Sequence, residues 1–150
     1  MSVDRSYIAE NKTELARLQA FIAGRSDADL ARPMPAGWTV AGVLAHLAFW
    51  DQRILLLLEQ WEQAGVAPPV EQREDVDWIN DAAKPMFLAL APRRAAELAL
   101  SIAQAVDAKV AGVSDDLVAR NAAAGTPLNL VRATHRREHL EELERALPGR

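Results

Sequence analysis

Residues 39–63 read TVAGVLAHLAFWDQRILLLLEQWEQ, and this stretch decides the fold. Apolar residues recur in it every three or four positions from Val40 to Trp61, which places one continuous apolar stripe along a helix of about seven turns. Thr39 is a favourable N-cap, because its hydroxyl oxygen can accept a backbone N–H of the first turn. A helix of this length must bury its stripe against other helices, so the sequence predicts an all-α protein.

Three further segments show helical periodicity. We expect helices over roughly residues 3–24, 92–111 and 127–147. Between residues 70 and 91 the pattern is weaker and Pro85 interrupts it, so we expect a crossover with one or two short helical pieces. Four amphipathic helices with one long crossover between the second and the third describe a four-helix bundle, which we expect to form a single domain over residues 1–150.

Composition excludes several classes of function. The chain has no cysteine, which excludes disulfides, thiolate metal sites and cysteine nucleophiles. Its formal net charge of −4 does not suit a nucleic-acid partner, which normally requires a basic stripe. The N-terminus lacks the apolar region of a signal peptide, and apolar runs such as residues 54–58 are far too short to span a bilayer. We therefore expect a cytoplasmic protein with no membrane partner.

The histidines form the most informative constellation. The chain has three, His46, His135 and His139. His135 and His139 lie one turn apart on the apolar side of the fourth helix, and His46 lies on the flank of the stripe of the second. Three converging imidazoles form a site for Zn²⁺, Ni²⁺ or Fe²⁺ that leaves coordination positions open. The alternative is that all three are hydrogen-bonded core residues.

Two motifs carry a family resemblance. The segment GWTVAGVLAHLAFWD, residues 37–51, resembles the signature of the DinB-like superfamily, in which a GW[ST]V…LAH motif opens the second helix and contains the first metal-ligand histidine. The segment HRREHL, residues 135–140, is similar to the closing HxxxH of that family. The resemblance implies a DinB-like four-helix bundle, often a homodimer, with one divalent metal ion held by His46, His135 and His139.

The resemblance does not select a reaction. Relatives include thiol S-transferases that use bacillithiol and mycothiol-dependent maleylpyruvate isomerases. It therefore implies a metal-dependent enzyme, a thiol S-transferase, isomerase or hydrolase, that acts on a small molecule and in some cases uses a low-molecular-weight thiol cofactor. The alternative is a non-catalytic bundle that sequesters a metal ion or a small molecule.

Several residues near the histidines are candidates for further roles. Trp50 follows His46 by one turn and either lines a substrate pocket or packs in the core. Trp78 and Asn80 fall in the crossover, in a stretch that resembles the segment covering the metal pocket in one DinB-like subgroup. They either line the pocket mouth as substrate-binding residues or belong to the crossover alone. Glu142 either accepts a proton near the metal or pairs with Arg145, and we favour the pair. No catalytic acid or base is assigned.

Two further expectations concern charge and assembly. Asp51 is expected to pair with a neighbouring arginine. Arg136, Arg137, Glu138 and Glu141 are expected on the outer face of the fourth helix. Residues 55–57 are leucines beside the stripe of the second helix, so apolar groups occupy more of its circumference than one core face requires. We expect these leucines to lie in a homodimer interface.

Overall fold

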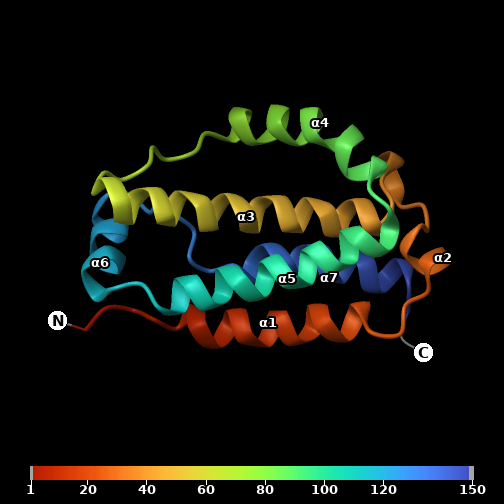
Figure 1. Cartoon of the computed structure of the whole chain (residues 1–150), viewed down its shortest axis with the longest axis horizontal. Helices are drawn as coiled ribbons and strands as arrows, with labels where there is room; N and C mark the ends of the chain where they lie inside the picture. Colours follow the sequence, from red (N-terminus) through yellow and green to blue (C-terminus); the bar gives the residue numbers. More distant parts are fainter. Residues whose placement is uncertain (1, 149–150) are drawn as a thin grey trace.

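The structure, a computed structural model that describes residues 2–148, is built from helices, and those residues form no β-strand. Its helices are α1 (Tyr7–Ile22), α2 (Asp27–Leu30), a 3₁₀ turn η1 (Pro35–Gly37), α3 (Val40–Ala64), α4 (Arg73–Ala89), α5 (Pro92–Ala111), α6 (Asp115–Ala123) and α7 (Ala133–Ala146). Figure 1 shows α1, α3, α5 and α7 running along the long axis, with α2 and α6 at opposite ends and α4 beyond α3. The predicted all-α bundle is confirmed.

The central helix α3 begins and ends as its sequence predicts. The Thr39 hydroxyl accepts the Gly42 N–H at 2.9 Å, and Gly65 ends the helix in the left-handed conformation, with a φ of 70° that favours glycine. By length and composition alone α3 is also able to cross a membrane, but 67% of its most apolar window is buried inside the molecule. It is therefore the core helix of the bundle.

The core consists of two apolar clusters at opposite ends of the bundle. One joins the first half of α3 to α2 and the C-terminal parts of α1 and α7, and includes Leu44 and Leu140. The other joins the second half of α3 to α6 and the end of α5, and includes Leu58 and Val106. Asp51 lies between the two clusters along α3 and is 2% exposed, so the middle of the bundle is polar.

The crossover differs from its prediction. A 17-residue helix, α4, replaces the expected short pieces and continues through Pro85. A proline inside a helix removes one backbone hydrogen bond. Pro85 is exposed, so water can satisfy the carbonyl that loses its partner. The prediction was wrong because it took Pro85 as a helix breaker, whereas the helix continues through it at an exposed position.

The fourth helix starts later than predicted, at Ala133 rather than Pro127. The Asn121 side chain bonds both the N–H and the carbonyl of Leu128, at 3.0 and 2.8 Å. The Asn11 side chain, from α1, bonds the Leu130 carbonyl and the Ala133 N–H, both at 2.9 Å. These side chains take backbone groups that a longer helix would use, and they hold residues 127–132 in an irregular conformation. The connector before them contains α6, a short helix that was not predicted.

Candidate metal centre

Two helices position the three histidines. His46 lies in the first half of α3, two turns after the Thr39 cap, and is 8% exposed. His135 and His139 lie in the first two turns of α7 and are both half-buried. Because Asn11 fixes the start of α7 at Ala133, the position of both imidazoles depends on a contact with α1.

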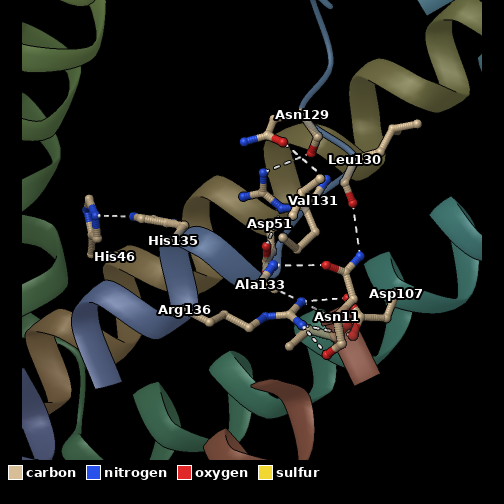
Figure 2. A network of polar contacts seen from close by, with 12 residues as sticks. Asn11, His46, Asp51, Asp107, Asn129, Leu130, Val131, Ala133, His135 and Arg136 are labelled. Atoms are coloured by element: carbon tan, nitrogen blue, oxygen red, sulfur yellow. Dashed lines mark hydrogen bonds and ion pairs between the residues drawn. The ribbon is translucent and has the colours of Figure 1, made fainter. Parts of the chain in front are cut away.

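The three imidazoles converge on one point. The Nε2 atoms of His46 and His135 lie 3.0 Å apart, and Figure 2 shows the two rings pointing toward each other. Ring centroids are 4.9 Å apart for His46 and His135, and 4.8 Å apart for each of the other two pairs. One nitrogen from each ring lies within 4.8 Å of the others. The predicted convergence of the three side chains is therefore present.

Burial keeps two of these imidazoles neutral. Desolvation, followed by the charge of His139, lowers the pKa of His46 to about 4. Desolvation also lowers the pKa of His135 far below its usual value, with smaller effects from His139, His46 and the arginines at 132 and 136. A neutral imidazole has a lone pair to donate to a metal ion, whereas a protonated one does not.

The spacing of the His46 and His135 nitrogens fits a divalent ion. Two nitrogens that each lie about 2.0–2.1 Å from one ion are about 2.9–3.4 Å apart, depending on the bond angle, and the two Nε2 atoms are 3.0 Å apart. The buried Nδ1 of His46 has no hydrogen-bond partner among the described residues, so no protein contact fixes the tautomer of this ring. Nitrogen-only donor sets suit Zn²⁺, Ni²⁺ and Fe²⁺.

A cavity of about 1300 Å³ opens beside the histidines. Its walls come from α3, α4, α7 and the irregular segment that precedes α7. Trp38 and Phe87 pack their rings against His46 at centroid distances of 5.9 and 6.2 Å, so one side of the site is apolar. The cavity gives small molecules a path to the three histidines.

Of the three candidate pocket residues, Trp50 and Asn80 line the cavity and Trp78 does not. Trp50 and Asn80 line the cavity and are joined by a hydrogen bond of 2.8 Å from the indole N–H to the amide oxygen. Trp78 is 60% exposed, does not line the cavity and donates to Asp75 at 3.3 Å. Glu142 also lines the cavity, and its carboxylate lies 3.4 Å from Nδ1 of His139.

Comparison with known proteins places the fold in a family. Residues 12–146 match the family described as the mycothiol maleylpyruvate isomerase N-terminal domain, a DinB-like domain. The chain belongs to this family. No curated protein and no solved structure matches it. The predicted DinB-like resemblance is therefore confirmed over nearly the whole chain.

This DinB-like domain also contains a buried charge network that was only partly predicted. Asp51 accepts hydrogen bonds from Arg132 at 2.8 Å and from Arg136 at 3.2 Å, which confirms its expected pairing with arginine. Arg136 also pairs with Asp107 at 2.7 Å (Figure 2). Arg136 was expected on the outer face of α7, but it is 1% exposed. The expectation was wrong because Asp51 and Asp107 pull the guanidinium into the middle of the bundle.

The sequence does contain a signal for this network. Asp51 follows Leu47 by four residues and precedes Ile54 by three, so its carboxylate falls within the apolar stripe of α3. A buried carboxylate requires a cation or several hydrogen-bond donors, and α7 has arginines at positions 132 and 136, one turn apart. The sequence could therefore have identified the partners of Asp51 before the structure was known.

Proposed function

We propose that this chain binds one divalent metal ion, Zn²⁺, Ni²⁺ or Fe²⁺, through His46, His135 and His139, and acts as a metal-dependent enzyme on a small molecule. The observation that carries the proposal is the convergence of three nitrogen donors beside a cavity of about 1300 Å³. Structural metal sites are usually closed by four protein ligands, whereas three ligands leave a position for water or substrate.

The residues of the chain have distinct roles in this proposal. A bound ion would act as a Lewis acid, which favours the deprotonated form of a water or thiol at neutral pH. His46 and His135 would offer neutral nitrogens, and the Glu142 carboxylate would orient His139 by accepting its Nδ1–H. Trp38 and Phe87 would exclude water from one side of the site.

We also propose a low-molecular-weight thiol as a second cofactor, on chemical grounds. The chain has no cysteine, so any thiolate must come from a bound small molecule. The cavity is at least as large as the 300–1,000 Å³ or so that is typical of small-molecule sites, which leaves room for both a thiol and a substrate. The description of the family names mycothiol. The reaction would then be S-transfer or isomerisation, and with water in place of the thiol it would be hydrolysis.

Metal analysis tests the first part of this proposal. Protein purified without an affinity tag should bind about one equivalent of Zn²⁺, Ni²⁺ or Fe²⁺ per chain, measured by mass spectrometry of the metal after dialysis. A chain that binds less than about a tenth of an equivalent of each, in repeated titrations at neutral pH, would contradict the metal site and leave the histidines as core residues.

A thiol screen tests the second part. The metal-loaded chain is incubated with an electrophile and one of several low-molecular-weight thiols, mycothiol and bacillithiol among them, and the loss of free thiol is followed. The enzyme proposal expects turnover with at least one thiol, or hydrolysis of the electrophile without any. Metal binding with no turnover in either arm would instead support a bundle that sequesters its ligand.

We also propose that the chain forms a homodimer through the surface around residues 55–57 of α3. Leu56 is 48% exposed, and Leu55 and Leu57 are half-buried. Leu56→Glu should convert a dimer into a monomer in multi-angle light scattering, because a carboxylate cannot be buried in an apolar interface without a partner. Glu59→Gln, on an exposed position of the same helix, is the control. A wild-type chain that is monomeric at high concentration would contradict the proposal.

A further inference from the structure

Arg132 is the one arginine of the buried network that lines the cavity as well. Its side chain is 5% exposed. Its Nε donates to Asp51 at 2.8 Å, and its Nη1 donates to the Asn129 carbonyl at 3.2 Å. The remaining nitrogen, Nη2, has no hydrogen-bond partner among the described residues. Arg132 is thus held rigidly while part of its donor capacity is unused.

The start of α7 adds further unused donors at the same place. Asn11 accepts the Ala133 N–H, but the backbone N–H groups of Thr134 and His135 have no acceptor among residues 2–148. Thr134 lines the cavity together with Arg132. The first turn of a helix carries a partial positive charge and favours an anion, and α7 has 14 residues.

We propose that Arg132 and the first turn of α7 form a carboxylate-binding subsite in the cavity, beside the three histidines. A carboxylate oxygen would accept from Nη2 of Arg132 and from the backbone N–H of Thr134. The assignment of this carboxylate to a substrate rests on the proposed function, but binding itself does not. The subsite therefore favours small molecules that present a carboxylate to the end of the cavity where α7 begins.

The charge of the network favours a monoanion. Asp51 and Asp107 together balance the charges of Arg132 and Arg136, so the subsite offers directed N–H donors and little excess positive charge. Such a site suits a carboxylate, which has a single charge, better than a phosphate, which has nearly two. The donors would compensate only part of the free energy needed to desolvate a phosphate.

Titration of the full chain with three probes tests the subsite. Butanoate, its neutral analogue butanamide and inorganic phosphate are each added at low salt, with EDTA present so that no metal ion captures the anion. Binding is followed by NMR at the backbone N–H of Thr134 and at the Nε–H of Arg132. Butanoate should shift both signals, and it should bind about tenfold more tightly than butanamide or phosphate.

Two lysine variants separate the subsite from the network that supports it. Arg132→Lys retains the charge beside Asp51 but loses the planar set of donors, so butanoate affinity should fall about fivefold or more. Arg136→Lys is the matched control, because Arg136 pairs with the same Asp51 but does not line the cavity. Its affinity for butanoate should stay within about twofold of that of the wild-type chain.

A third variant covers the case in which Arg132→Lys does not fold. Asn129 is exposed, lines the cavity, and donates no side-chain hydrogen bond to the described residues. Asn129→Asp places a competing carboxylate beside Arg132 and should weaken butanoate about fivefold. Equal affinity for butanoate and butanamide, or unchanged affinity in both cavity variants, would overturn the subsite. The metal analysis is a separate measurement, so failure of one proposal does not imply failure of the other.

Discussion

Asp51→Ala is expected to lower the free energy of unfolding by about 3–5 kcal/mol, because it leaves two buried guanidinium groups without their shared carboxylate. Arg132 and Arg136 are both at least 95% buried at the side chain, and both donate to Asp51. Arg132 has no other carboxylate within ion-pair distance among the described residues. Urea unfolding followed by circular dichroism at 222 nm measures the change, with the slope of the transition expected to remain constant.

The control for this variant is an exposed ion pair of similar length. Asp115 pairs with Arg5 at 2.6 Å, but its side chain is 70% exposed. Exposed pairs contribute roughly 0–1 kcal/mol, so Asp115→Ala should have a small effect. If Asp51→Ala were no more destabilising than Asp115→Ala, the two arginines would have to find water or other partners, and the bundle centre would be more open than the structure shows.

The sequence predicts the helices of the bundle well because their apolar stripes are local and continuous. Residues 39–63 contain both the cap and the stripe of α3, and the predicted limits of α5 agree with the structure at both ends. In these segments the side chains that determine the helix are within the helix itself. Periodicity and capping therefore carry nearly all of the information.

The start of α7 could not be predicted in the same way. The sequence around Pro127 has a favourable helix-opening residue, but Asn121 and Asn11 take the backbone groups of residues 128–133. Asn11 lies more than a hundred positions away in the chain. A bond of this kind depends on which helices become neighbours in the fold. Local sequence patterns do not contain that information.

The candidate metal residues were accessible from the sequence for a different reason. The chain has three histidines in total, and the spacing of two of them defines a helix face. The sequence could indicate that Arg132 is a partner of Asp51, but the unused donor of Arg132 and its place beside the cavity appear only in the structure.

His135→Ala is expected to abolish metal binding, with a loss of affinity of at least about a hundredfold, while the helical fold is retained. Removing one of the three nitrogen donors leaves only His46 and His139. Two ligands bind a metal ion much more weakly than three. Isothermal titration with Zn²⁺ measures the affinity. Glu138→Gln is the matched control, since Glu138 lies on the same helix and lines the same cavity but is not one of the three convergent residues.

The fold should survive this substitution because the two apolar clusters do not depend on the ion. Leu140 and Leu143 of α7 are fully buried next to the site, and the other cluster lies in the opposite half of the bundle. The variant leaves His46 without its contact at 3.0 Å, at a cost of about 1–3 kcal/mol, but it also removes a second buried polar group.

Metal removal from the wild-type chain should lower stability only by the binding linkage, about 2.7 kcal/mol when free metal was present at a hundred times its dissociation constant. If chelation instead abolished the helical circular dichroism at room temperature, the ion would be a structural element, and the open-site enzyme would lose its main physical support.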